Sequence, residues 1–339
     1  MRVAIVGATG AVGTEFLGIL EERDFPITSL TLFASARSAG RSLPFRGQEL
    51  QVRQLPDDGD LQADVVFASA GGSISKEHAK RWAAHGAVVI DNTSAWRMDP
   101  EVPLVIPEAN GEAALSHRGI IANPNCSTII ALMALAPLHR AFGLQRATVA
   151  TYQAVSGAGA AGIEELREQT RAALDGHELA PRKFQHPIAF NLFSHDSAIH
   201  DDGYNAEERK LLLESRKILG QDDLRVSATC VRVPVFRAHS EAIHAEFARS
   251  VSADQVREVL AAAPGVQVVD DRARNTFPTP LAASGGDDVL VGRIRDDASL
   301  PGAVALFAAG DQIRKGAALN AVQIAEHLIA RGALTLPRA

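Results

Sequence analysis

Cysteine is scarce in this sequence, and long apolar runs are missing. The 339 residues hold two cysteines, Cys126 and Cys230, which can form at most one disulfide and cannot complete a four-ligand zinc site by themselves. No stretch reaches the roughly 18 uncharged apolar residues that a membrane-spanning helix needs. The apolar run in residues 1–7 is too short for a signal peptide. We therefore expect a cytoplasmic protein with reduced thiols, no membrane segment and no metal site.

An excess of basic charge is absent as well. Lys and Arg number 34 against 40 Asp and Glu, so the formal net charge is −6, and the pI is near 6.0. Basic residues are spread along the chain, which argues against a nucleic-acid partner or a polybasic membrane surface. The hydrophobic fraction of 46% is typical of a globular protein, and the length favours two domains.

The first third of the chain alternates short apolar segments with amphipathic ones. The spacing predicts strands over 3–6, 30–34, 64–68 and 88–91, and helices over 12–22 and 75–85. This rhythm is typical of right-handed βαβ units. The predicted fold class is α/β, with a Rossmann-type parallel sheet in the first domain.

The pattern changes after Cys126. A helix is predicted over 127–142, and strands over 146–154, 225–235, 243–247 and 289–294. Residues 182–204 have no clear period and are predicted to form an extended loop, and residues 311–329 an amphipathic helix. We predict domains over 1–126 and 127–310, the second of α+β type. A C-terminal segment, 311–339, is expected to pack back on the first domain.

A glycine-rich turn stands between the first predicted strand and helix. It reads Gly7-Ala8-Thr9-Gly10-Ala11-Val12-Gly13. Glycines allow a tight turn there, and the N–H groups that open the helix can bind a pyrophosphate. The alternative is a turn whose glycines serve packing only. The position of the turn, after the first strand of a doubly wound pattern, favours a dinucleotide site.

The end of the second predicted strand favours NADP over NAD. NAD sites place a carboxylate there for the ribose 2′-hydroxyl, whereas this strand is followed by Ser35, Arg37 and Ser38. An arginine can pair with a 2′-phosphate, and the serines can donate hydrogen bonds to it. The alternative is an ordinary solvated arginine in a polar loop.

Cys126 has the surroundings of a nucleophile, and Cys230 does not. The segment Asn123-Pro124-Asn125-Cys126-Ser127-Thr128 precedes an apolar helical run, so Cys126 lies near a helix N-terminus, which stabilises a thiolate and offers N–H groups to an oxyanion. Cys230 lies in an apolar strand and is typical of a small buried residue. His239 follows a predicted strand, lies at its expected exposed end, and is a candidate acid or base.

Nine blocks of the chain carry a further pattern. They span 6–13, 34–40, 91–98, 123–128, 153–159, 207–210, 230–235, 239–242 and 316–320. In this order the blocks resemble aspartate-β-semialdehyde dehydrogenases of the bacterial type along nearly the whole chain. The resemblance implies a homodimer formed through the second domain, and a role in the biosynthesis of lysine, diaminopimelate, threonine, methionine and isoleucine.

The resemblance also implies a role for each matching residue. Cys126 matches the acyl-enzyme nucleophile, His239 the acid/base and Gln153 the residue that orients the substrate. Arg232 matches the residue that binds the substrate carboxylate, and Glu207 the residue that binds its ammonium. The residues that match the phosphate site are Arg97, Asn125 and Lys210. The NADP site corresponds to Gly7, Thr9, Gly10, Ala11, Val12, Ser35, Arg37, Ser38, Ser156, Gly157 and Asn320.

The implied reaction is the NADPH-dependent conversion of aspartyl 4-phosphate to aspartate 4-semialdehyde and phosphate, through a thioester on Cys126. Two alternatives stay open. An N-acetylglutamyl-phosphate reductase would need no Glu207, because an acetylated amine is uncharged. A non-catalytic NADP-binding protein would need the glycine turn and Arg37 but not Cys126. Two departures from the family pattern stand at Ser194-His195 and at Ala238 beside His239.

Overall fold

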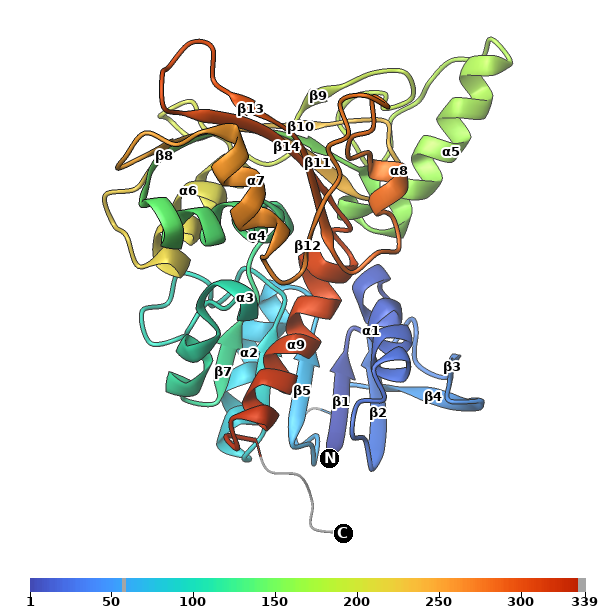
Figure 1. Ribbon diagram of the computed structural model, residues 1–339. Helices are drawn as coiled ribbons and strands as arrows, with labels where there is room; N and C mark the ends of the chain where they lie inside the picture. The colour runs from blue at the N-terminus through green and yellow to red at the C-terminus, as the bar shows by residue number, and fades with distance from the viewer. Residues whose placement is uncertain (57–58, 335–339) are drawn as a thin grey trace. The chain divides into compact units, whose positions relative to one another are not determined.

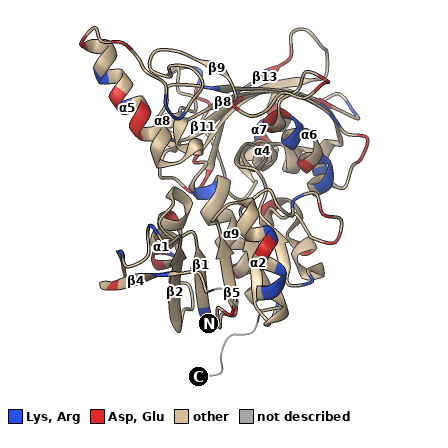
Figure 2. Ribbon diagram, turned by 180° about the vertical axis from the view of Figure 1, so that it is seen from behind, with Lys and Arg blue, Asp and Glu red and all other residues tan. Residues whose placement is uncertain are grey.

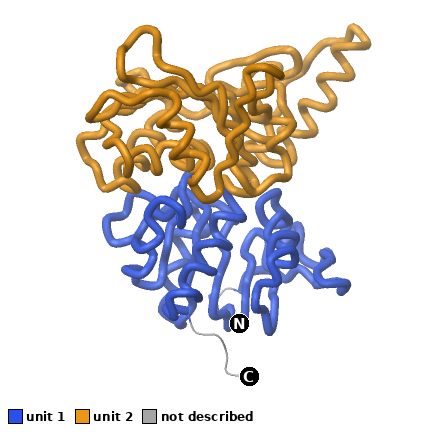
Figure 3. The backbone as a smooth tube through the Cα atoms, in the orientation of Figure 1, with its two compact units in different colours: residues 1–125, 317–339 blue, residues 126–316 orange. Residues whose placement is uncertain are grey.

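The computed structural model describes residues 1–56 and 59–334 (Figure 1). The chain divides into two compact units, shown in two colours in Figure 3. The first comprises residues 1–125 and 317–339, and the second comprises residues 126–316. The end of the predicted C-terminal segment, 335–339, lies outside the described residues. The chain passes from one unit to the other at Asn125–Cys126 and returns at Gly316–Ala317.

The first unit contains a largely parallel sheet, as the sequence predicts. The strand order is β3-β4-β2-β1-β5-β6-β7, and all neighbours are parallel except the β3–β4 pair at the edge. The strands are β1 (Arg2–Val6), β2 (Ser29–Ala34), β3 (Ser42–Phe45), β4 (Gln48–Gln54), β5 (Val65–Ala68), β6 (Val88–Asp91) and β7 (Ile120–Ala122). The order reverses beside β1, so the turn after β1 lies at the topological switch point where such sheets bind ligands.

Helices cover both faces of this sheet. Helices α1 (Ala11–Glu22) and α9 (Leu319–Ala330) contact each other and share a core with alternate strand residues such as Ile5 and Phe67. The intervening strand residues are buried too and face the other way, toward α2 (Gly72–Ala84), which contacts β6 and β7. A strand with both faces buried has the continuous apolar sequence seen here. Short turns at α3 (Pro107–Asn110) and η1 (Gly111–Ser116) precede β7.

The second unit contains a mixed sheet with the order β12-β13-β14-β11-β8-β10-β9. Its central pairs, β14–β11 and β11–β8, are antiparallel, whereas β8–β10 is parallel. The strands are β8 (Leu144–Gln153), β9 (Phe193–Ser194), β10 (Arg225–Arg232), β11 (His239–Phe247), β12 (Val266–Val268), β13 (Val289–Asp296) and β14 (Val304–Gly310). The predicted combination of a Rossmann-type domain and an α+β domain is confirmed.

Three helices contact this sheet or pack against one another beside it. They are α4 (Cys126–Phe142), α6 (Ala206–Leu219) and α7 (Ala253–Ala261). Along β8, Ala147, Val149 and Thr151 are buried, while Tyr152 between the buried positions is 39% exposed. This alternation of buried and exposed side chains shows that one face of the second sheet is covered by helices and the other is more open. The remaining elements are η2 (Val155–Ala158), α5 (Ala160–Leu174) and α8 (Pro280–Ala283).

Two sequence predictions need correction. The helix predicted from residue 311 begins later: Asp311 instead accepts the N–H groups of Ile313 and Arg314, at 2.9 and 3.0 Å, and a π-turn over Arg314–Ala318 leads into α9. A carboxylate that caps a turn in this way replaces the missing helical bonds. His239 was expected at an exposed strand end, but it is the first residue of β11 and only 1% exposed.

None of the helices in the described residues is both long and apolar enough to span a membrane. Figure 2 shows basic and acidic residues interspersed along helices such as α2, α5 and α6. Along these three helices, charges of both signs therefore alternate.

Candidate active site

In the glycine turn of the first unit, two of the three glycines are at positions where a side chain would clash with neighbouring backbone. Gly7 has a φ of +92°, and a Cβ there would lie 2.7 Å from the backbone of Ser69. A Cβ at Gly13 would overlap the backbone of Gly7 and Ala8, so α1 can approach the strand only because Gly13 has no side chain. Gly10 has more room, since its nearest contact would be 3.4 Å away.

The first turn of α1 is open to an anion. Gly10 is the N-cap, and no side chain caps the helix. The N–H groups that open an α-helix have no partner within the helix, so they can bind a pyrophosphate. Of the predicted cofactor residues, Ala11 and Val12 lie in this first turn, and Thr9 precedes the N-cap.

Ser35, Arg37 and Ser38 lie in the turn that follows β2. Ser35 and Arg37 are exposed, and the Ser38 N–H donates to the Ser35 carbonyl at 2.8 Å. Within the described residues no ion pair is formed by Arg37. Its guanidinium is thus available to a ligand at this edge of the sheet.

Arg97 and Asn320 converge on Asn123. The Arg97 Nε donates to the Asn123 carbonyl and its Nη2 to the Asn92 carbonyl, both at 2.9 Å. The Asn320 amide donates to Asn123 Oδ1 at 2.7 Å. These bonds hold the segments that follow β6 and β7 together. Asn125, another predicted phosphate residue, is the buried last residue of this stretch of the first unit.

Asp91 shapes the segment that carries Arg97. Its carboxylate accepts bonds from the Ser75 hydroxyl at 2.5 Å and from the Thr93 N–H at 2.8 Å. Burial raises the pKa of Asp91, although these bonds and the nearby Arg97 charge oppose the shift.

Cys126 is the first residue of α4 and is partly exposed. Gly316 packs against it, because a Cβ at Gly316 would lie 3.0 Å from the Cys126 Cβ. Neither cysteine forms a disulfide, and Cys230 is buried. Burial raises the pKa of the Cys230 thiol well above its ordinary value, so it is a poor nucleophile. The burial of Cys230 agrees with its prediction as a small buried residue.

A chain of polar contacts runs from the first turn of α4 to α6. Gln153 Nε2 donates to Ser127 Oγ at 2.5 Å and to Glu207 Oε1 at 3.1 Å. The Lys210 ammonium pairs with Glu207 Oε2 at 2.8 Å, one turn along the same helix. Four side chains from three elements thus form one connected group. Gln153 Oε1 is buried and has no partner among the described residues.

A capping box fixes the start of α6. The Glu208 N–H donates to Asn205 Oδ1 and the Asn205 N–H to Glu208 Oε2, each at 2.9 Å. The same Glu208 also accepts the Cys230 N–H at 3.0 Å. The box orients the first turn of the helix and therefore Glu207. Its sequence signal, an Asn followed three residues later by Glu, was present but not used in the prediction.

His239 is held as a neutral ring. Its Nδ1 accepts the Ala154 N–H at 3.0 Å, so the proton of the neutral ring is on Nε2. Burial, together with the nearby Arg232 charge, lowers the pKa of His239 to about 3. Nε2–H is the polar group that the ring can still present to a ligand.

Arg232 closes β10 and is 3% exposed. Its Nη1 donates to the Ala154 carbonyl at 2.9 Å, so Ala154 contacts both Arg232 and His239 through its backbone. Gly157, predicted at the cofactor, lies beside both: a Cβ there would be 3.2 Å from the Arg232 Nη1 and 3.3 Å from the His239 ring. Ser156 accepts a hydrogen bond from the Gln312 side chain, whose Oε1 also accepts the Ala238 N–H.

We expect burial of neutral His239 to make stability depend on pH. With a pKa near 3 in the folded state against 6.5 for the unfolded chain, its contribution is fully present above pH 6.5 and falls as pH drops toward 3. Asn at this position can still accept the Ala154 bond but does not titrate. Chemical denaturation of wild type and His239→Asn across pH 4 to 8 should therefore give curves that diverge on the acid side. Parallel curves would show that the ring is not held neutral.

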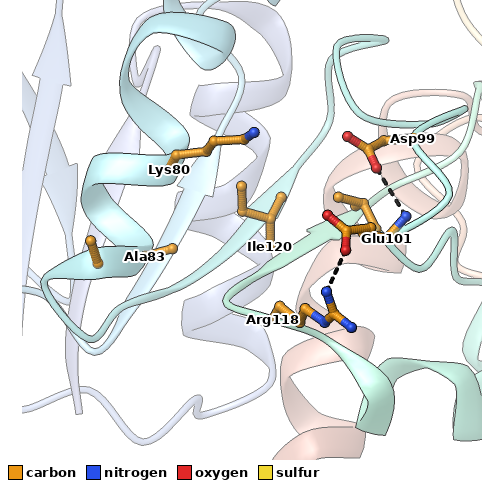
Figure 4. Close-up of a pocket in the computed structure, with 8 residues that line it drawn as sticks. Lys80, Ala83, Asp99, Glu101, Arg118 and Ile120 are labelled. Carbon is orange, nitrogen blue, oxygen red and sulfur yellow. Dashed lines mark hydrogen bonds and ion pairs between the residues drawn. The ribbon is translucent and has the colours of Figure 1, made fainter.

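A separate pocket of about 320 Å³ lies in the first unit between α2 and the segment that leads to β7 (Figure 4). None of the predicted site residues lines it. Two of its basic residues already have partners: Arg118 pairs with Glu101, and Lys80 lies 5.3 Å from the centre of the Trp96 ring. We assign it no function. Among the described residues, no group of three or more His, Cys, Asp and Glu could hold a metal ion.

The comparisons with known proteins cover nearly the whole chain. The family described as "Semialdehyde dehydrogenase, NAD binding domain" matches residues 2–117, and "Semialdehyde dehydrogenase, dimerisation domain" matches residues 135–315. A protein of Synechocystis sp. named aspartate-semialdehyde dehydrogenase is 53% identical over 332 residues, which cover 98% of each chain.

Solved structures of aspartate semialdehyde dehydrogenases are also similar to this chain. Aspartate semialdehyde dehydrogenase II from Vibrio cholerae, complexed with ASA, is 45% identical with a TM-score of 0.93, over 97% of this chain and 98% of that chain. Aspartate semialdehyde dehydrogenase from Candida albicans, solved with NADP, is 27% identical with a TM-score of 0.76, over 98% and 99% of the two chains.

Proposed function

Because the chain belongs to the aspartate-semialdehyde dehydrogenase family, we propose that it interconverts aspartyl 4-phosphate and aspartate 4-semialdehyde with NADP through a thioester on Cys126. The observation that carries this proposal is the connected group behind Cys126. Gln153 links Ser127, the residue after the nucleophile, to Glu207 and through it to Lys210. A dinucleotide-binding protein without catalysis would not need these residues joined.

The first step is attack of the Cys126 thiolate on the acyl carbon. A carbon–sulfur bond forms, and phosphate leaves with the electron pair of the broken carbon–oxygen bond. The start of α4 favours the thiolate, and its first-turn N–H groups are suited to an acyl oxygen that gains charge. Lys210, Arg97 and Asn125 are the proposed phosphate residues. Lys210 can exchange its bond with Glu207 for a charge-assisted bond to phosphate.

The second step reduces the thioester to the aldehyde. NADPH, when bound, would supply the hydride to the thioester carbon. When the carbon–sulfur bond breaks, the sulfur leaves with the electron pair as a thiolate, and the Nε2–H of His239 can donate a hydrogen bond to it. This role fits the observed bonding, since the Ala154 N–H keeps Nδ1 free of a proton.

Arg232 and Glu207 are the proposed partners of the amino-acid end of the substrate. Both are at least 96% buried, so a charged partner there is worth more than in water. The arginine suits the carboxylate and the glutamate the ammonium. A substrate that lacks either charge leaves its partner buried and unpaired, which penalises analogues.

Most of the proposed NADP residues belong to the first unit, whereas Ser156 and Gly157 belong to the second. The steric need for glycine at Gly7 and Gly13 and the uncapped start of α1 fit a pyrophosphate, and the exposed Arg37 fits a 2′-phosphate. The neighbour from Candida albicans was solved with NADP. The matched dimerisation domain supports a homodimer. We also propose that the product serves the biosynthesis of lysine, threonine, methionine and isoleucine.

Arg37→Ala should raise KM for NADP roughly tenfold or more and change KM for NAD little, because one charge-assisted pair with the 2′-phosphate is lost. Initial rates with each cofactor measure the effect. Arg41→Ala, which changes an exposed arginine close by in the chain, is the matched control. An unchanged preference for NADP would make Arg37 an ordinary solvated residue.

The direct test of function is NADP reduction by aspartate semialdehyde with and without phosphate. We expect reduction that requires phosphate, because phosphate must release the acyl group from Cys126. The same assay with N-acetylglutamate semialdehyde should give far lower turnover, since that compound has no ammonium for Glu207. No phosphate-dependent reduction with aspartate semialdehyde would overturn the proposal.

A further inference from the structure

The Arg232 side chain is already hydrogen bonded to the loop that follows β9. Its Nη2 lies 2.8 Å from His195 Nε2 and 3.0 Å from Asp196 Oδ1. Asp196 therefore forms an ion pair with the arginine, and the arginine is almost fully buried whereas the Asp196 side chain is 21% exposed. The sequence showed this loop only as a departure from the family pattern.

The donors of Arg232 can be counted. A guanidinium has five N–H groups, one on Nε and two on each Nη. One Nη1 hydrogen goes to the Ala154 carbonyl, and both Nη2 hydrogens go to His195 and Asp196. Nε is buried and has no partner among the described residues.

This count leaves no complete fork for a substrate. A carboxylate that binds arginine at two points uses Nη2 together with either Nη1 or Nε. Both arrangements need an Nη2 hydrogen, and both of those hydrogens are engaged. A substrate carboxylate can therefore bind at two points only if His195 or Asp196 gives up its place.

Asp196 is the partner that can leave. His195 is held from behind, because its Nδ1 lies 3.1 Å from Ser197 Oγ, and that hydroxyl accepts the N–H of Glu207 at 3.2 Å. Because arginine can only donate, His195 Nε2 accepts, and the ring proton is on Nδ1, which donates to Ser197 Oγ; the Ser197 N–H, 3.2 Å from Nδ1, is then a close approach and not a hydrogen bond. Asp196 binds Arg232 through one oxygen and is the more exposed of the two side chains. Exchange of one carboxylate for another also keeps the buried guanidinium paired throughout.

We propose that Asp196 is an internal competitor: its carboxylate occupies the fork of Arg232 until the α-carboxylate of the substrate replaces it. The proposal rests on the assignment of Arg232 to the substrate carboxylate. Asp196 keeps the buried cation neutralised in the free protein and opposes ligands that bring no carboxylate of their own. Burial raises the pKa of Asp196, but Arg232 outweighs burial and holds it below its ordinary value, so the competitor stays charged at neutral pH.

Asp196→Asn is the test, measured as KM and kcat in NADP reduction by aspartate semialdehyde and phosphate. Loss of the competing charge should lower KM for the semialdehyde on the order of tenfold, the value of one charge-assisted hydrogen bond. KM for phosphate and kcat should not change. A purely structural role would not lower KM. Asp202→Asn, which removes an aspartate paired with Arg209 in the same loop region, should leave KM unchanged.

Asp196→Ser gives a second reading if the asparagine variant fails to fold, and thermal unfolding of each variant identifies that case. A KM that stays the same or rises in the folded variants would overturn the proposal, and a rise would instead indicate that Asp196 binds the ammonium. Arg232→Lys separates the two hypotheses. If Arg232→Lys keeps the wild-type KM for the semialdehyde, Arg232 does not bind the substrate carboxylate. If Arg232→Lys raises this KM but Asp196→Asn does not lower it, Arg232 keeps its assigned role and only the competitor role of Asp196 is wrong.

Discussion

Cys126→Ser is expected to remove nearly all turnover, by at least ~10³-fold in kcat, while NADP still binds. A serine hydroxyl has no comparable anion fraction at neutral pH, so the start of α4 has no thiolate to stabilise. The substitution is nearly isosteric, and the close packing of Gly316 against the Cys126 Cβ is kept. The measurement is kcat in both directions, with cofactor binding followed by nucleotide fluorescence.

Cys230→Ser is the matched control for that prediction. This thiol is buried in β10, so its replacement should leave kcat intact and cost only stability. An inactive but folded Cys230→Ser protein, or an active Cys126→Ser protein, would contradict the assignment of the two thiols.

Arg232→Lys is expected to cost about a hundredfold in kcat/KM although the charge is kept. Lysine has no planar fork, so it cannot bond the Ala154 carbonyl and the loop after β9 while also holding a carboxylate at two points. The lost contacts are largely buried, which is why the expected effect is large. Steady-state kinetics with the semialdehyde as the varied substrate measure it.

Glu207→Gln and Lys210→Ala test whether the two ends of the substrate are assigned correctly. Glu207→Gln should raise KM for the semialdehyde, because the ammonium loses its ionic partner. Lys210→Ala should raise KM for phosphate and spare the semialdehyde, although it also frees Glu207 from the ion pair seen here. If both variants showed only the phosphate defect, the thioester mechanism would survive, but aspartyl phosphate as the substrate would not.

The sequence predicted the strands of the first unit more completely than those of the second. The parallel strands β1, β2, β5 and β6 were predicted because each is a short apolar run, and a strand with both faces buried needs no alternation to be recognised. The antiparallel strand β14 and helices α5 and α7 were not predicted. Edge strands β3 and β9 lacked any clear pattern, since β3 has one buried residue and β9 has none.

The residue types of the candidate site could be read from local signals. The glycine turn, the cysteine before a helical run and the spacing of Glu207 and Lys210 each lie within a few residues of chain, and the family resemblance assembled the rest. The proton positions could not be read in this way. His239 was expected at an exposed strand end, whereas the structure buries it and gives its Nδ1 a backbone partner.

What the sequence determined by itself is therefore local: a glycine turn between a strand and a helix, and a thiol at a helix start, with the proposed substrate residues named by the family resemblance. The tertiary structure alone decided which donors and acceptors are already engaged. Arg232 and His239 meet Ala154 across 78 and 85 residues of chain, and Gln153 meets Glu207 across 54. Pairings over such separations depend on strand register and helix placement, which no local pattern encodes. The protonation of His239 and the closed fork of Arg232 follow from those pairings.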